Sequence, residues 1–206
     1  MLQFITHKSD RFSIAEEVKM VIDGGCRWVQ LRMKDVSDEE VKSVAEQIIP
    51  MCQETDTILV IDDRVELTMD LKVHGVHLGK NDMPAVDARE YLGAGAIIGV
   101  TANTAQDIIA YKKVDVDYVG LGPFRYTTTK SNLSPIIGLD GYRDIITEVR
   151  NASVELPIVA IGGITLEDVA ELMSTGVNGI AMSGAILSAE NPTEYTKRVI
   201  EALNKR

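Results

Sequence analysis

Short apolar runs recur along the chain, and amphipathic segments separate them. The runs are rich in Val and Ile and are apolar almost without interruption, which is typical of strands buried on both faces of a parallel sheet. The chain contains eight such runs, at residues 2–6, 28–33, 57–62, 75–79, 96–102, 118–123, 157–163 and 179–184.

The segments between these runs carry the signals of helices. Residues 14–22 place Ile and Val on one helical face, and two glycines follow as a stop signal. Ser37 and Glu40 have the spacing of a capping box, residues 165–168 repeat that spacing, and residues 192–203 predict a last helix. Strands that alternate with helices predict repeated β/α units and a parallel sheet.

Two α/β architectures compete for this pattern. An open doubly wound sheet usually needs five or six strands, whereas eight β/α units that close on themselves make a TIM barrel. The count of eight runs favours a (β/α)8 TIM barrel, and 206 residues lie at the short end of the range for that fold. Because no linker or low-complexity tract interrupts the chain, we expect one domain over residues 1–206.

In barrel enzymes the active site lies at the carboxyl ends of the strands, so we expect the functional residues of this chain there. Polar residues and glycines follow nearly every predicted strand. Those that we expect to form one site are Gln30, Arg32, Lys34, Asp62, Asp63, Asp82, Thr101, Thr127, Thr129, Lys130, Gly163, Ser183 and Gly184.

Glycines follow the last two predicted strands. In many barrels these two loops bind a phosphate through backbone N–H groups, which a glycine leaves accessible. Gly162-Gly163 and Ser183-Gly184 fit that use, although plain turn glycines remain the alternative.

Cations and carboxylates accompany these loops. Arg32, Lys34 and Lys130 suit a second, more highly charged anion, and Asp63 and Asp82 suit Mg²⁺, which prefers one or two carboxylates together with phosphate oxygens. The combination favours a diphosphate held through a metal; surface salt bridges are the alternative.

The long polar segment 124–139 contains the Thr-rich stretch before Lys130. Long loops inside compact domains are usually functional, so this segment is a candidate lid over a charged substrate.

The amino-acid composition limits the kinds of molecule that the protein is expected to bind. The chain has 31 acidic and 21 basic residues and a net charge of −10, which disfavours nucleic acid and anionic membranes. Two cysteines make no disulfide framework, and neither a signal peptide nor a run long enough to span a membrane is evident. We expect a cytoplasmic protein that binds small molecules; its oligomeric state, homodimer included, stays open.

Six motifs, in order along nearly the whole chain, resemble the thiamine-phosphate synthase (thiamine-phosphate pyrophosphorylase) family. Each is moderately specific, and their common order makes the resemblance strong. The matching segments are VQLRMKD at 29–35, DDR at 62–64, GVHLGKNDMP at 75–84, GPFRYTTTK at 122–130, AIGGI at 160–164 and GIAMSGAI at 179–186.

The resemblance implies a TIM-barrel transferase that needs Mg²⁺. It couples 4-amino-2-methyl-5-hydroxymethylpyrimidine diphosphate to a thiazole phosphate and releases pyrophosphate through a pyrimidine carbocation. The implied roles are diphosphate binding by Arg32, Lys34 and Lys130, pyrimidine contact by Gln30, metal binding by Asp63 and Asp82, and thiazole phosphate binding by Thr127, Thr129, Gly163, Ser183 and Gly184.

This chain departs from the family pattern at several positions. Asp62 replaces an Asn that contacts the pyrimidine, and a carboxylate cannot donate as an amide does. Thr101 replaces a Ser and keeps its hydroxyl, Asn103 replaces a His, and Gly184 replaces the Ser of the last phosphate loop.

Three rival functions remain on the same fold. A thiazole tautomerase would share the phosphate pocket but has no use for the diphosphate machinery, and it tends to carry a His where this chain has Asn103. A non-catalytic thiazole-phosphate-binding relative would bind without turnover. A sugar-phosphate epimerase or isomerase would share only the phosphate loops.

Overall fold

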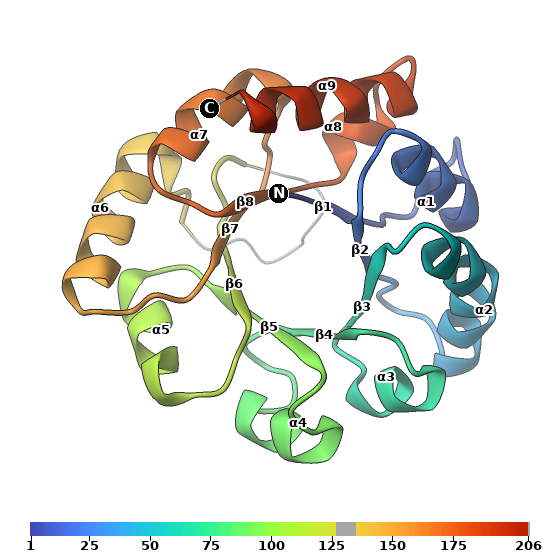
Figure 1. Cartoon of the computed structure of the whole chain (residues 1–206), viewed down its shortest axis with the longest axis horizontal. Helices are drawn as coiled ribbons and strands as arrows, with labels where there is room; N and C mark the ends of the chain where they lie inside the picture. The colour runs from blue at the N-terminus through green and yellow to red at the C-terminus, as the bar shows by residue number, and fades with distance from the viewer. Residues whose placement is uncertain (127–134, 206) are drawn as a thin grey trace.

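The strands close into a barrel. A computed structural model describes residues 1–126 and 135–205 of the chain, and its eight parallel strands pair in sequence order from β1 to β8, with β8 returning to β1 (Figure 1). This confirms the predicted TIM barrel. The strands are β1 (Leu2–Ile5), β2 (Trp28–Leu31), β3 (Ile58–Asp62), β4 (Gly75–Leu78), β5 (Ile97–Ala102), β6 (Tyr118–Leu121), β7 (Ile158–Ile161) and β8 (Gly179–Met182).

Helices surround the barrel as an outer ring (Figure 1). The α-helices are α1 (Ile14–Asp23), α2 (Asp38–Glu54), α3 (Val65–Leu71), α4 (Ala85–Leu92), α5 (Ala105–Ala110), α6 (Gly138–Asn151), α7 (Val169–Ser174), α8 (Gly184–Leu187) and α9 (Pro192–Asn204). Two short 3₁₀ helices join them, η1 (Tyr111–Lys113) and η2 (Leu166–Asp168). The capping box at Ser37 and Glu40 is present as predicted, because the Ser37 side chain accepts from the Glu40 N–H.

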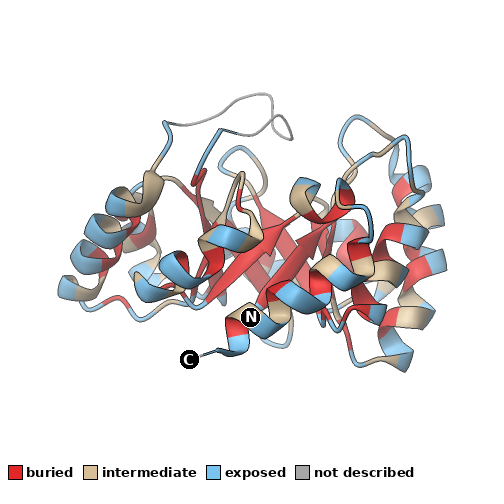
Figure 2. Cartoon of the chain, turned by 90° about the horizontal axis from the view of Figure 1, so that it is seen from above, coloured by how far each residue is buried: buried red, intermediate tan, exposed pale blue. Residues whose placement is uncertain are grey.

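Burial explains why the strands read as continuous apolar runs. The strands form the buried centre of the molecule, while the helices are exposed along their outer faces (Figure 2). One apolar cluster fills the space between sheet and helices, and a second, smaller one lies inside the barrel. In the second cluster Trp28 and Tyr118, each the first residue of its strand, pack edge to face with ring centroids 4.7 Å apart. They fill the barrel at its amino end and leave the carboxyl end for a site.

Most strands end one or two residues earlier than the apolar runs predict. Strand β2 ends at Leu31, so Arg32 and Lys34 lie in the loop that follows and not on the strand with Gln30. The backbone N–H of Arg32 donates to the hydroxyl of Thr6 at 2.8 Å, which takes the place of a strand hydrogen bond. The predicted strand 28–33 is therefore two residues too long, although Gln30, Arg32 and Lys34 all reach the same cavity.

Among the described residues, no helix is both long enough and apolar enough to cross a membrane.

Candidate active site

A cavity of about 700 Å³ opens at the carboxyl ends of the strands. All the predicted site residues that the structure describes line it: Gln30, Arg32, Lys34, Asp62, Asp63, Asp82, Thr101, Gly163, Ser183 and Gly184. The predicted residues Thr127, Thr129 and Lys130 lie outside the described residues.

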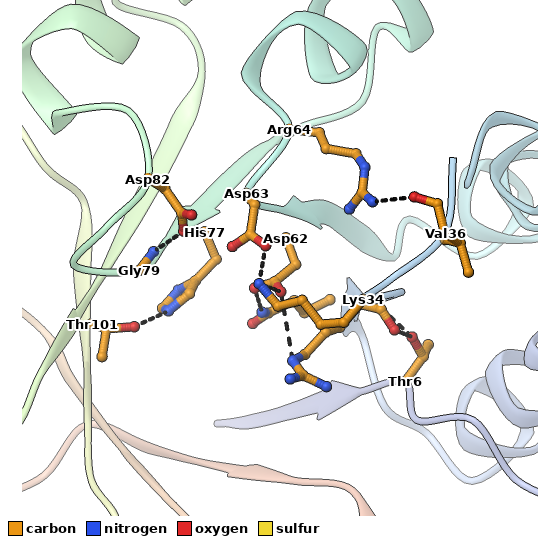
Figure 3. A network of polar contacts seen from close by, with 12 residues as sticks. Thr6, Lys34, Val36, Asp62, Asp63, Arg64, His77, Gly79, Asp82 and Thr101 are labelled. Carbon is orange, nitrogen blue, oxygen red and sulfur yellow. Dashed lines mark hydrogen bonds and ion pairs between the residues drawn. The ribbon is translucent and has the colours of Figure 1, made fainter. Parts of the chain in front are cut away.

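Two cations and two carboxylates form a network at one side of this cavity. Lys34 Nζ contacts a carboxylate oxygen of Asp63 and lies 3.2 Å from Asp62 Oδ2 (Figure 3). Arg32 Nε lies 3.6 Å from the same Asp62 oxygen. Asp62 is 5% exposed, so its end of this network is buried, whereas the Lys34 side chain is 41% exposed.

Local contacts hold the two cations in place. The Thr6 hydroxyl donates to the carbonyl of Arg32 at 3.2 Å and accepts from its N–H, which ties the end of β1 to the loop after β2. Arg64, just before α3, donates to the Val36 carbonyl at 3.0 Å and pairs with Asp38 at 2.7 Å. The segment that carries Lys34 is thus braced at both ends.

Asp63 has a backbone that non-glycine residues seldom adopt. Its φ is 67°, in the left-handed region, and its N–H donates to the His77 carbonyl at 2.9 Å. Such strain persists only where the surroundings enforce it, and it concentrates at functional sites. Here the turn brings the Asp63 carboxylate to Lys34 and into the cavity (Figure 3).

The carboxylates fit a hard cation. Asp82 Oδ2 accepts from the Gly79 N–H at 2.6 Å, and Asp63 Oδ2 pairs with Lys34. Each therefore keeps a second oxygen, and an all-oxygen set of one or two carboxylates suits Mg²⁺. Over the described ranges, no group of three or more His, Cys, Asp or Glu side chains could hold a metal ion. A metal here would need substrate oxygens or water to complete its coordination.

The glycines after β7 are required by their surroundings. Gly162 and Gly163 have φ values of 102° and 66°, and a Cβ on either would lie 2.8 Å from backbone atoms of the segment after β6. Arg125 fastens this loop, because its Nη1 donates to the Gly163 carbonyl at 2.9 Å and its guanidinium binds both oxygens of Asp168 at 2.8 Å. The Arg125 hydrogen bonds lower the pKa of Asp168.

The loop after β8 offers a hydroxyl as well as backbone. Ser183 Oγ is buried and has no hydrogen-bond partner in the described part of the chain, although Ser183 lines the cavity. A Cβ at Gly184 would meet nothing within 4 Å, so glycine is not sterically required there. The cavity is thus lined by a buried hydroxyl at Ser183 and by bare backbone at Gly184.

A chain of buried polar groups crosses the barrel and reaches the cavity at Thr101. Gln3 Nε2 donates to the Tyr118 hydroxyl at 3.1 Å, that hydroxyl lies 3.0 Å from His77 Nδ1, and His77 Nε2 lies 3.1 Å from Thr101 Oγ1. Burial raises the pKa of Tyr118, which keeps the phenol neutral. If the Tyr118 hydroxyl donates its hydrogen to His77 Nδ1, the imidazole of His77 carries its own proton on Nε2 and donates it to Thr101 Oγ1. The Thr101 hydrogen is then left to point at a ligand.

The cavity is also lined by Gln3, Thr165 and Tyr126, which the sequence patterns do not place in a site. The signal for Gln3 was present, because it is a polar residue inside an otherwise apolar strand, LQFI. The sequence predicts only a helix start at Thr165 and only a loop at Tyr126.

A closed parallel barrel with cations, carboxylates and glycine-rich loops at its carboxyl end defines a barrel enzyme that handles phosphorylated substrates. A family model described as thiamine monophosphate synthase matches residues 2–186. The chain belongs to the thiamine monophosphate synthase family, as its motifs predicted.

Individual relatives agree with this assignment. The chain is 53% identical to the thiamine-phosphate synthase of Bacteroides thetaiotaomicron, over 97% of this chain and 95% of that protein. It is 41% identical to the thiamine-phosphate synthase of Flavobacterium psychrophilum, over 100% of this chain and 98% of that protein. Among solved structures, a thiamine phosphate pyrophosphorylase from Pyrococcus furiosus matches with a TM-score of 0.85 and 30% identity, over 98% of this chain and 94% of that one.

Proposed function

We propose that this transferase joins hydroxymethylpyrimidine diphosphate to thiazole phosphate and releases pyrophosphate, with the reaction confined to the cavity at the carboxyl ends of the strands. The observation that carries the proposal is that one cavity holds both the Arg32–Lys34–Asp63 network and the glycine loops after β7 and β8. A substrate with a diphosphate and a substrate with a phosphate can therefore lie side by side.

The diphosphate end lies at the network. Arg32 and Lys34 bind the diphosphate, and Lys130 joins them as the sequence motif implies. Asp63 and Asp82 would hold Mg²⁺, which would supply charge neutralisation of the leaving diphosphate. In this scheme the cations stabilise the departing group and no side chain acts as a nucleophile.

The thiazole phosphate lies at the opposite loops. The phosphate is bound by backbone N–H groups of Gly163 and Gly184 and by the Ser183 hydroxyl, which has no hydrogen-bond partner among the described residues. Thr127 and Thr129 are further contacts that the family motif implies. Gln30, Asp62 and Thr101 line the same cavity and contact the pyrimidine. The fixed substrates then need only to be held in line for the thiazole nitrogen to attack.

The decisive experiment mixes the purified protein with both substrates and Mg²⁺ and follows thiamine phosphate and pyrophosphate, with EDTA as the control. Product that depends on Mg²⁺ supports both the reaction and the metal. No product with retained binding of thiazole phosphate would contradict the proposal in favour of a tautomerase or a non-catalytic binder. Turnover of a carboxylated thiazole phosphate then separates those two.

We place this activity in the cytoplasm, where both phosphorylated substrates would be retained. Size-exclusion chromatography with light scattering decides between a monomer and a homodimer.

A further inference from the structure

Lys80 is a third cationic side chain in the described lining of the cavity, beside Arg32 and Lys34. It lies in the turn that follows β4, and two hydrogen bonds close this turn. The Asp82 N–H donates to the Gly79 carbonyl at 3.3 Å, and the Gly79 N–H donates to Asp82 Oδ2 at 2.6 Å. The turn that presents the Asp82 carboxylate therefore also carries Lys80. We expect an anion bound through Asp82 to lie within reach of the flexible lysine side chain.

The partner of Lys80 in this structure is Asp107, in the first turn of α5. Lys80 Nζ donates to Asp107 Oδ2 at 2.7 Å. The two side chains are 44% and 26% exposed, and exposed ion pairs of this kind contribute at most about 1 kcal/mol. Asp107 is not among the described residues that line the cavity. Lys80 can therefore leave this partner at little cost.

Asp107 stays hydrogen-bonded without Lys80. Its Oδ2 also accepts from the Asn103 N–H at 2.8 Å and from the Thr104 N–H at 3.1 Å. The second of these bonds belongs to the capping box at the start of α5, in which the Thr104 side chain accepts from the Asp107 N–H. The departure of Lys80 would thus leave the carboxylate with two backbone donors and the helix with its cap.

The other two described cations of the cavity differ in this respect. Arg32 and Lys34 pair with Asp62 and Asp63, and both of these carboxylates line the cavity themselves. If either cation turns to a substrate, a carboxylate that has lost a partner stays beside that substrate. Lys80 leaves its carboxylate outside the cavity lining, so its transfer adds positive charge to the cavity without exposing a negative one there.

We propose that Lys80 is a transferable diphosphate-binding residue, which leaves Asp107 and donates to the diphosphate when that group enters the cavity. This rests on the proposed function. One charge-assisted hydrogen bond replaces another, from Lys80 Nζ to a phosphate oxygen instead of Asp107 Oδ2, and no proton is transferred. The diphosphate carries more negative charge than one carboxylate and gains more as the C–O bond breaks. The new hydrogen bond is therefore the stronger one, and it strengthens further in the transition state.

The alternative is that the Lys80–Asp107 pair only fastens the loop after β4 to α5. The two substitutions that break the pair separate these readings. A fastening role predicts the same loss from either substitution, because the pair is broken in both. Transfer predicts opposite effects on diphosphate binding, since Lys80→Gln removes the binding cation and Asp107→Asn removes its competing partner.

The test is calorimetry of pyrophosphate in the presence of Mg²⁺. Lys80→Gln should weaken the affinity for pyrophosphate about 10-fold. Asp107→Asn should strengthen it about 2- to 5-fold, and this gain should vanish when Lys80→Gln is also present. The Asn keeps an oxygen that accepts the two backbone N–H groups, so the cap of α5 is preserved. A loss of affinity in both single variants, or no change in Lys80→Gln, would overturn the proposal.

Two controls separate a local contact from a change in net charge. Lys19→Gln removes an exposed cation that pairs with Asp23 on α1, outside the described lining of the cavity, and should leave the affinity for pyrophosphate unchanged. Binding of thiazole phosphate to Lys80→Gln should also be unchanged. An equal loss in Lys19→Gln, or an equal loss for thiazole phosphate, would overturn the assignment of Lys80 to the diphosphate.

The two proposals fail separately. Pyrophosphate binding needs no turnover, so it decides the role of Lys80 even if the wild type makes no thiamine phosphate and the proposed function fails. A wild type that does not bind pyrophosphate would overturn the role of Lys80 directly. If Asp107→Asn does not fold, the comparison of pyrophosphate with thiazole phosphate in Lys80→Gln still decides, because that substitution lies at a partly exposed side chain.

Discussion

Glu17 is a carboxylic acid enclosed in helix α1, and it makes the stability of the protein depend on pH. Its side chain has no exposed surface. Oε2 accepts from the His7 N–H at 3.2 Å, whereas Oε1 has no hydrogen-bond partner among the described residues. Burial, opposed in part by the His7 hydrogen bond, raises the pKa of Glu17 from 4.5 to about 7.

The sign and size of the effect follow from this pKa. A group whose pKa is raised on folding stabilises the protein in its protonated form, and that contribution is lost as pH rises from about 4.5 to about 7. At about 1.4 kcal/mol for each pKa unit, the loss is about 3 kcal/mol. Glu17→Gln mimics the protonated acid at every pH. Its free energy of unfolding should therefore rise relative to that of the wild type by about 3 kcal/mol over this interval and then level off.

The assay is urea unfolding followed by circular dichroism at pH 4.5, 5.5, 6.5, 7.5 and 8.5. The quantity plotted is the free energy of unfolding of Glu17→Gln minus that of the wild type at each pH. If the nitrogen of the new amide finds no acceptor, the variant loses about 1–3 kcal/mol at every pH, which shifts this plot without changing its slope. The matched control is Glu46→Gln, on the exposed side of α2, whose free energy of unfolding should differ from that of the wild type by the same amount at every pH. Parallel curves for wild type and Glu17→Gln would refute the argument.

Three further substitutions test the site. Lys130→Ala should lower kcat by orders of magnitude with an unchanged circular dichroism spectrum, and near-full activity would remove Lys130 from the site. Tyr118→Phe should lower kcat/KM about 10-fold and the free energy of unfolding by about 1–2 kcal/mol, because it breaks the hydrogen bonds through His77 that orient Thr101. Unchanged kinetics would contradict a role for these hydrogen bonds in the site. Arg125→Ala should raise KM for thiazole phosphate about 10-fold and leave KM for the pyrimidine diphosphate unchanged, because it releases the Gly163 carbonyl. A rise in both KM values would show that the substitution perturbs the whole cavity and not this loop alone.

The fold could be predicted because each strand is buried on both faces and each helix on one. Those two environments impose different hydrophobic periods, and the count of eight runs then selects a closed barrel. Strand ends could not be predicted, since a strand stops where its backbone finds another partner. Arg32 shows this: its N–H binds the Thr6 hydroxyl, 26 residues away in sequence.

The site divides in the same way. Residues that directly follow strands, such as Asp63 and Ser183, could be predicted, because parallel strands bring their carboxyl ends together. The contact between Gln3 and Tyr118 joins residues 115 positions apart and depends on the barrel being closed. Residues with such supporting contacts carry no local sequence signal beyond an unexpected polar position in an apolar run.

The pairing of Arg32 and Lys34 with Asp62 and Asp63 sets two positive charges against two negative ones before any substrate arrives. A diphosphate that enters alone must take Lys34 from Asp63 and leave a carboxylate without a counter-charge, and a metal ion that enters alone must displace Lys34. When both enter, each charge exchanges one partner for another. In the proposed reaction, metal and diphosphate would therefore bind as mutual counter-ions, and each would raise the affinity of the protein for the other by the same factor.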